Sequence, residues 1–261
     1  IYDEIIKQPG FVLLHDYSLH HLVLDRSRTR ANEFHDLISD KWNYYQEWND
    51  SIFLHFEIPY DLLIDLIPLG LELDSFNEKY YVSLVAFTMN ELYPKNLFPL
   101  DYISNFHEIN IRTYVKKNNK YGVYFINIEA EKKLSSCVAK ILSKLPYEPS
   151  EIIRKPNNYR SLNHRKKLEL DIDYNIHDRV IKKRDLDIWL LERYCLFYVK
   201  SSKIFRYDIY HKPWSIQALE LIRMKIKYRF GNVILNSDNL ASFHYSKGVH
   251  VLSWPRVNMS Y

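Results

Sequence analysis

The chain has 261 residues, 47% of them hydrophobic and 26% charged, a composition typical of a globular protein with one large core. The net charge is only +4 and the basic runs are short, which argues against a nucleic-acid-binding protein. No apolar stretch reaches the roughly 18 residues of a membrane span, and no signal-peptide pattern is present. Cys137 and Cys195 are interpreted as small buried hydrophobes, so the sequence predicts a cytoplasmic protein.

Aromatic residues are abundant and glycines are scarce. The chain has 22 Tyr, 13 Phe and 5 Trp, which favour strands, against 5 Gly. Because the glycines lie far apart, the glycine-rich loops of a Rossmann dinucleotide site and of a P-loop are both excluded.

Residues 1–33 differ from the rest and are expected to form a separate N-terminal segment, followed by one domain over residues 34–261. Within the domain, strands are expected over residues 42–56, 80–87, 109–115 and 121–128, the last two forming a hairpin. Helical spacing predicts helices over residues 59–67 and 134–145, ended by Pro68 and Pro146.

The second half of the chain continues in the same way. Strands are expected over residues 168–174, 195–200, 204–210, 243–245 and 249–254, with a turn at Gly248 between the last two. Asp185 is placed to cap a short helix through Trp189 and Leu190. Many short strands with few helices predict a mostly β protein, folded as an antiparallel barrel or sandwich.

Two groups of histidines could be taken for metal sites. Those of residues 15–21 lack the i, i+4 spacing and the third ligand of known zinc motifs. His244 and His250 are separated by the expected turn at Gly248. We therefore expect no metal and no cofactor.

The strand over residues 106–115 carries the strongest candidate site. With a period of two, Glu108, Asn110, Arg112 and Tyr114 share one face, and apolar residues share the other. The polar face either meets water or lines a barrel interior. In a barrel interior Glu108 would pair with Arg112, and Arg112 could bind a carboxylate through two hydrogen bonds. Spacing alone leaves both alternatives open.

Six short motifs follow one another along the chain: LIPLGLELD at 66–74, EINIRTYV at 108–115, GVYF at 122–125, LPY at 145–147, ERY at 192–194 and HKPW at 211–214. In this order they resemble the YqjF-like family of uncharacterised bacterial proteins, over roughly residues 38–255. Residues 9–22 are similar instead to an internal segment of bacterial glycosyltransferases with two Rossmann domains. The N-terminal segment is therefore interpreted as a remnant or a fusion scar.

The YqjF-like family looks related to the acetoacetate decarboxylase-like fold, so the resemblance implies an antiparallel β barrel or cone around a small-molecule pocket. Decarboxylases of that type form a Schiff base between a lysine and the substrate. Here Tyr147 stands where that lysine is expected, so the resemblance implies a pocket without Schiff-base chemistry. Glu108 is similar to the glutamate of that family, with Arg112 as its strand neighbour.

The first functional hypothesis is a protein that binds a small organic acid or an aromatic compound. The residues expected to bind this ligand are Arg112, Asn110, Tyr114 and His211. The second hypothesis is a lyase or hydrolase with Glu108 as general acid or base and Tyr147 or His107 as a second proton-transfer group. A structural or partner-binding protein is the third, and the sequence does not fix the oligomeric state.

Overall fold

The computed structural model describes residues 42–95, 104–131, 145 and 147–259. The chain divides into two compact units, Ile1–Trp42 and Asn43–Tyr261, and every helix and strand of the described residues belongs to the second. The predicted boundary at residue 33, the glycosyltransferase-like segment, Cys137 and nearly all of the predicted helix over residues 134–145 lie outside the described residues.

Strands dominate the described unit. They are β1 (Tyr44–Glu57), β2 (Glu72–Leu73), β3 (Tyr81–Pro94), β4 (Phe106–Lys117), β5 (Lys120–Ala130), β6 (Tyr147–Pro149), β7 (Glu151–Lys155), β8 (Asn158–Asn163), β9 (Leu168–Val180), β10 (Cys195–Lys200), β11 (Lys203–His211), β12 (Gln217–Phe230), β13 (Val233–Leu235), β14 (Leu240–Ser253) and β15 (Val257–Asn258). The described helices are short: α4 (Tyr60–Leu63), the 3-10 helix η1 (Ile64–Leu66) and α7 (Asp185–Leu191). The predicted mostly β fold class is confirmed.

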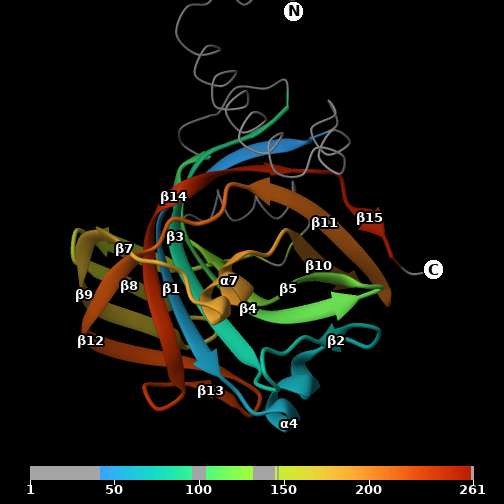
Figure 1. The fold of residues 1–261 in the computed structure, drawn as a ribbon, viewed down its shortest axis with the longest axis horizontal. Helices are drawn as coiled ribbons and strands as arrows, with labels where there is room; N and C mark the ends of the chain where they lie inside the picture. The colour runs from blue at the N-terminus through green and yellow to red at the C-terminus, as the bar shows by residue number, and fades with distance from the viewer. Residues whose placement is uncertain (1–41, 96–103, 132–144, 146, 260–261) are drawn as a thin grey trace, which may run out of the picture. The chain divides into compact units, whose positions relative to one another are not determined.

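The strands form one large sheet that closes on itself. Its order is β15-β11-β10-β5-β4-β3-β1-β14-β12-β9-β8-β7, and β11 also pairs with β14. The strands β11, β10, β5, β4, β3, β1 and β14 therefore form a closed ring, and β12, β9, β8 and β7 continue beyond it (Figure 1). Neighbouring strands of the ring are antiparallel except for β10 and β5, which pair in parallel.

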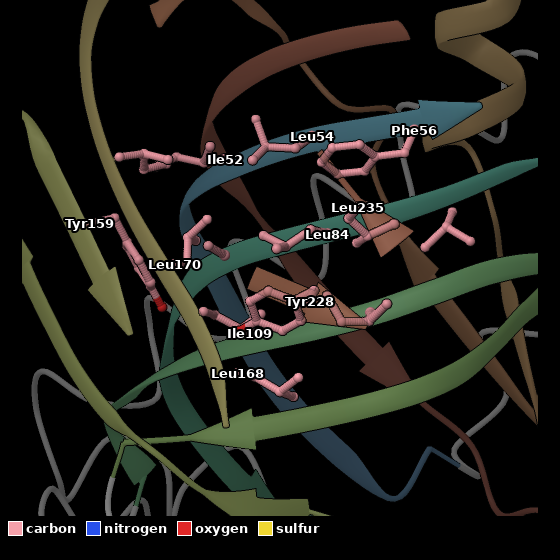
Figure 2. Packing of buried hydrophobic residues seen from close by; sticks show 14 of the residues in the cluster. Ile52, Leu54, Phe56, Leu84, Ile109, Tyr159, Leu168, Leu170, Tyr228 and Leu235 are labelled. Carbon is pink, nitrogen blue, oxygen red and sulfur yellow. The ribbon is translucent and has the colours of Figure 1, made fainter. Parts of the chain in front are cut away.

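Two apolar cores lie on the two faces of the ring strands. The outer core joins β1, β3 and β4 to β8, β9 and β12, and it includes Leu54, Leu84, Ile109, Leu170 and Tyr228 (Figure 2). The inner core collects the residues on the opposite face of the same three strands, together with residues from β5, β10 and β14. Strands buried on both faces must be apolar on both, which β1 satisfies over residues 52–56 apart from His55, and β3 over residues 81–87 apart from Ser83.

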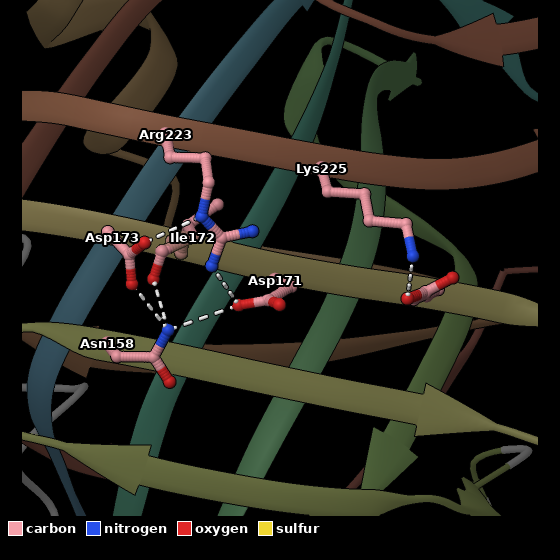
Figure 3. A network of polar contacts seen from close by, with 7 residues as sticks. Asn158, Asp171, Ile172, Asp173, Arg223 and Lys225 are labelled. Atoms are coloured by element: carbon pink, nitrogen blue, oxygen red, sulfur yellow. Dashed lines mark hydrogen bonds and ion pairs between the residues drawn. The ribbon is translucent and has the colours of Figure 1, made fainter.

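The exposed surface of the β9–β12 pair is held by ion pairs. Arg223 binds Asp171 at 2.8 Å and Asp173 at 2.6 Å, and Asn158 donates to both carboxylates (Figure 3). Arg223 and Asp173 are partly exposed, with 47% and 38% of their side-chain surface open to water, so the pairs contribute little to stability. This face is a solvated surface, as expected for charged residues outside the cores.

The predicted cap of helix α7 is wrong. The N-cap residue is Arg184, and Asp185 is the first residue of the helix. The backbone N–H of Arg184 donates to Asp187 Oδ2 at 2.9 Å, and its guanidinium binds the same carboxylate at 2.8 Å. A carboxylate three residues into a helix satisfies the free amide at its start, as in a capping box. Asp187 therefore does what was expected of Asp185.

The predicted turn at Gly248 is also wrong, because β14 runs unbroken from Leu240 to Ser253. Gly248 has a φ of +138° and lies opposite Asn49 of β1. A Cβ atom at this position would lie 2.5 Å from the backbone oxygen of Trp48. The glycine therefore permits a close approach of two strands, which is the other common reason for a glycine inside a strand.

We predict that Gly248→Ala lowers the free energy of unfolding by more than Gly231→Ala. Gly231 has a φ of +57°, and the nearest atom to an added Cβ is Leu66 Cδ2 at 3.8 Å, so that substitution meets only the left-handed strain of about 1–2 kcal/mol. Gly248→Ala adds a clash with backbone that cannot move independently. Urea denaturation of both variants measures the difference, and equal losses would contradict the close approach.

Candidate functional site

The ring encloses a cavity of about 120 Å³. Much of its wall is apolar, with Trp48 from β1, Phe87 from β3, Phe125 from β5 and Trp214 from the segment that follows β11. Polar side chains from β1, β4, β6 and β14 and from the segment that follows α7 interrupt this wall. An apolar cavity with a small number of convergent polar groups is the usual form of a small-molecule site.

Strand β4 presents its polar face to this cavity. Glu108, Asn110 and Arg112 line the cavity, whereas Ile109 and Ile111 between them belong to the outer core. The strand is held by β3 on one side and by β5 on the other. A slip of one residue would move the charges into the apolar core, so burial of both faces fixes the register.

Glu108 is 3% exposed and hydrogen-bonded through both oxygens. Its Oε2 accepts from the hydroxyl of Tyr147 at 3.0 Å, and its Oε1 accepts from Asn110 Nδ2 at 3.4 Å. Burial raises the pKa of Glu108 to about 7, although the hydrogen bonds from Tyr147 and Asn110 lower it. Near neutral pH the carboxyl group therefore exists in both protonation states.

The expected pairing of Glu108 with Arg112 is wrong. Among the described residues, the partners of the Glu108 carboxyl are Tyr147 and Asn110, and no ion pair joins it to Arg112. The two residues stand four positions apart on one strand, which separates their Cα atoms by about 13 Å at the usual rise of a strand. Asn110 lies between them on the same face, and its side-chain amide donates to the Glu108 carboxylate.

Arg112 is buried, and two of its nitrogens, Nε and Nη2, have no hydrogen-bond partner among the described residues. Burial lowers the pKa of Arg112, and the neighbouring Tyr114 raises it. The Nε and Nη2 atoms share one edge of the planar guanidinium, which is the edge that binds a carboxylate through two parallel hydrogen bonds. Arg112 therefore lines the cavity with a buried charge whose anion-binding edge is unsatisfied.

A second arginine, Arg193, lines the same cavity. Its Nη1 binds Asp74 at 2.7 Å and its Nε donates to the carbonyl of Trp189 at 2.7 Å. The guanidinium carbon also lies 4.2 Å from the centre of the Trp189 ring, within cation–π range. Sequence reasoning missed Arg193, although the ERY motif that contains it was a signal.

The ERY and HKPW motifs meet in space. Glu192 accepts from the backbone N–H of Trp214 at 3.0 Å and from the hydroxyl of Tyr194 at 2.8 Å. The Tyr194 and His211 rings lie 4.8 Å apart, and His211 packs on Trp214 at 5.4 Å. These contacts fix Trp214 in the cavity wall and leave Arg193, between Glu192 and Tyr194, directed to the cavity.

Two predicted ligand-binding residues stand behind the cavity wall rather than in it. The hydroxyl of Tyr114 donates to the carbonyl of Leu190 at 3.0 Å and lies 2.6 Å from Ser83 Oγ. His211 is buried, its Nδ1 donates to the carbonyl of Lys212 at 2.8 Å, and burial lowers its pKa to about 4. Both side chains support the wall, Tyr114 beneath Arg112 and Arg193.

His107, considered as a second proton-transfer group, points away from Glu108. It alternates with Glu108 along β4, and its Nδ1 lies 3.0 Å from Thr88 Oγ1. Tyr147 remains in place for that role because its hydroxyl contacts Glu108. Burial and the neighbouring Glu108 raise the pKa of Tyr147 well above its ordinary value, so Tyr147 stays a hydrogen-bond donor.

Among the described residues, no three His, Cys, Asp or Glu side chains come together as a metal site, and no helix has the length and apolar character to cross a membrane. The histidines of residues 15–21 lie outside the described residues. His244 binds Asp187 at 3.2 Å beside the start of α7.

The model of the DUF2071 family, described as an uncharacterized conserved protein, matches residues 45–250. The uncharacterized protein YqjF of Bacillus subtilis (strain 168) is 30% identical over 224 residues, which cover 82% of this chain and 91% of that protein. The chain belongs to the YqjF-like family. The predicted resemblance is confirmed, and the family match extends from β1 into β14 and so includes the residues of the β4 face.

Solved structures share the fold of this YqjF-like chain. The enduracididine biosynthesis enzyme MppR, with HEPES buffer bound, has a TM-score of 0.58 and 9% identity, covering 84% of this chain and 88% of that one. Acetoacetate decarboxylase from Legionella pneumophila subsp. pneumophila str. Philadelphia 1 has a TM-score of 0.53 and 11% identity, covering 83% and 88%. The acetoacetate decarboxylase-like fold is therefore confirmed, and identities this low show the fold alone.

The lysine expected of a Schiff-base decarboxylase has no counterpart at Tyr147, which lines the cavity and donates to Glu108. Among the described residues that line the cavity there is no lysine. Lys144, three positions before Tyr147, lies outside the described residues.

We predict that the wild type loses stability relative to the Glu108→Gln variant as the pH rises from about 4.5 to 7. The pKa of Glu108 is about 7 in the folded protein against 4.5 ordinarily, so in this interval the folded state keeps a proton that the unfolded chain has lost. The relative loss should be of the order of 3 kcal/mol and should level off above pH 8. Urea denaturation across this pH range measures it.

The pH dependence of stability is measured for the Tyr147→Phe variant in the same experiment. This variant lacks a hydrogen bond that lowers the pKa of Glu108, so its loss of stability should extend to higher pH than in the wild type. Parallel pH profiles for the wild type and the Glu108→Gln variant would show that Glu108 titrates normally.

Proposed function

We propose that this protein binds a small organic acid inside the ring, with the carboxylate of the ligand on Arg112. The observation that carries the proposal is the state of Arg112: its side chain is buried and lines the cavity, and its Nε and Nη2 have no partner among the described residues. A buried charge without a counterion destabilises the folded protein. Removal of one partner from a buried ion pair typically lowers the free energy of unfolding by about 3–5 kcal/mol. An anionic ligand would offset that cost.

The charge balance of the cavity supports an anion over a neutral ligand. Arg193 is compensated by Asp74 at 2.7 Å, so it adds little net charge. Glu108 is partly protonated near neutral pH, since its pKa is about 7, and it is not paired with Arg112. Arg112 is therefore the uncompensated charge, and the aromatic side chains around it favour an apolar or aromatic body on the acid.

A second candidate, a lyase or hydrolase, is favoured by one specific feature of the same cavity. Glu108 faces the enclosed space with a pKa near the working pH, where a general acid or base is most effective. The contact of Tyr147 with Glu108, at 3.0 Å, would hold the carboxyl group in place during proton transfer. The bound acid would then be the substrate.

We also propose a cytoplasmic location, because two cysteines cannot build a disulfide framework, and cell fractionation would test it. A structural or partner-binding role stands as the third alternative. It would gain support from a stable protein to which no small acid binds.

We predict that small carboxylates raise the melting temperature of the wild type and not that of the Arg112→Gln variant. A ligand at a hundred times its dissociation constant stabilises the folded state by about 2.7 kcal/mol, which a thermal-shift screen resolves readily. Arg112→Lys should retain only part of the effect, because an ammonium group lacks the fork that binds a carboxylate twice.

Arg223→Gln is the matched control, since Arg223 lies on the solvated β9–β12 surface. It should respond to ligand as the wild type does. Equal responses from the Arg112→Gln and Arg223→Gln variants would place the acid elsewhere and contradict the proposal.

For the enzyme alternative, we predict that Glu108→Gln lowers turnover of a bound acid by about 10²–10⁴-fold, the usual contribution of a general acid or base. Binding of the same acid, measured by Trp fluorescence, should change much less because Arg112 is intact. Full turnover in the Glu108→Gln variant would remove Glu108 from the chemistry.

A further inference from the structure

The cavity has a second polar end, formed by Glu108, Asn110 and Tyr147 at one end of the β4 face, with Arg112 toward the other. We propose that the ligand is a hydroxy acid: its carboxylate binds Arg112, its hydroxyl donates a hydrogen bond to Asn110 Oδ1, and a flat apolar body lies between. This inference rests on the proposed function and adds the chemical class of the ligand.

The hydroxyl is assigned from the hydrogen bonds that are already made at this second end. Asn110 is 4% exposed, its Nδ2 donates to Glu108 Oε1 at 3.4 Å, and its Oδ1 has no hydrogen-bond partner among the described residues. When Glu108 is ionised, its carboxylate can only accept, so this contact assigns the amide nitrogen of Asn110 to the Glu108 side and the amide oxygen to the other side. The hydroxyl of Tyr147 is already donated to Glu108 Oε2. The second end therefore offers acceptors and suits a ligand group that donates.

The requirement for a donor follows from the cost of leaving Asn110 Oδ1 unpaired. A buried acceptor without a partner costs free energy, and a site built to bond a hydroxyl rejects the analogue that lacks it. A methoxy group at the same place brings another acceptor and cannot supply the bond. Hydroxyl, hydrogen and methoxy are thus distinguished by one interaction.

The flat body follows from the wall of the cavity. Trp48 and Trp214 lie nearly parallel, with an interplanar angle of 20° and ring centres 6.2 Å apart, and Phe87 lies 5.8 Å from Trp48. These rings offer faces and edges to an aromatic ligand. A cavity of about 120 Å³ has room for about four waters at about 30 Å³ each, and it is slightly smaller than the roughly 150 Å³ cavity that binds a benzene ring.

The test is a titration of the wild type, followed by Trp fluorescence, with three acids of increasing length: benzoate, phenylacetate and 3-phenylpropanoate. Each acid is compared with its 4-hydroxy and its 4-methoxy derivative. At the length that fits, we expect the hydroxy acid to bind about tenfold tighter than its parent, equivalent to about 1.4 kcal/mol. The methoxy acid should bind no tighter than the parent.

Asn110→Leu is the matched variant, because it keeps the size of the side chain and removes the acceptor. In this variant the hydroxy acid and its parent should bind with equal affinity, so the preference for the hydroxy acid is lost. Arg112→Gln should weaken all members of the series alike.

The outcomes separate the two proposals. If the parent acids bind and no hydroxyl improves binding at any length, the hydroxy acid is refuted while acid binding stands. A methoxy group as favourable as the hydroxyl, or a hydroxyl preference that persists in Asn110→Leu, refutes it too. If no acid binds to the wild type, the proposed function itself fails.

Discussion

Closure of the sheet through the pairing of β11 with β14 is the constraint on which the candidate site depends. In an open sheet the polar face of β4 would meet water, and Arg112 would be hydrated like any surface arginine. Closure removes that water and leaves a guanidinium edge to be satisfied by something else. The same interaction that completes the fold therefore creates the demand for an anion.

The outer core holds β4 in the position that the cavity requires. Ile109 and Ile111 are fully buried there, and the hydroxyl of Tyr159 donates to the backbone carbonyl of Glu108 at 3.1 Å. A layer that never touches the cavity thus fixes the strand at the residue whose carboxyl group faces it. Binding residues held by a two-sided strand are placed more rigidly than residues on a loop.

Local patterns in the sequence were enough for the strand that carries the site. The β4–β5 hairpin follows from alternation and from a turn at Asn118 and Asn119, both with positive φ, and the polar face of β4 follows from a period of two. The direction of that face depends on closure between strands far apart in the chain, so spacing could not decide it. For the same reason, spacing could not predict that Glu108 pairs with Asn110 and Tyr147. It could not predict either that Arg193 lines the same cavity.

Elsewhere, tertiary contacts overruled the local signal. The long strand β12 went unpredicted, because several charged residues on its solvated face interrupt the apolar alternation. The spacing around Gly248 predicts a turn, whereas the close approach of Trp48 in the neighbouring strand β1 is what requires a glycine. In both places the structure is determined by contacts with another strand, and a single sequence does not identify that strand.

The pairing of β1 with β14 also has a consequence for how the protein is made. Tyr44 pairs with Ser253, so the first and the last long strands of the unit are neighbours. While the chain emerges from the ribosome, β1 has only β3 as a strand partner, and its other edge stays unpaired until β14 appears. We expect the ring to close late, once β14 has been synthesised.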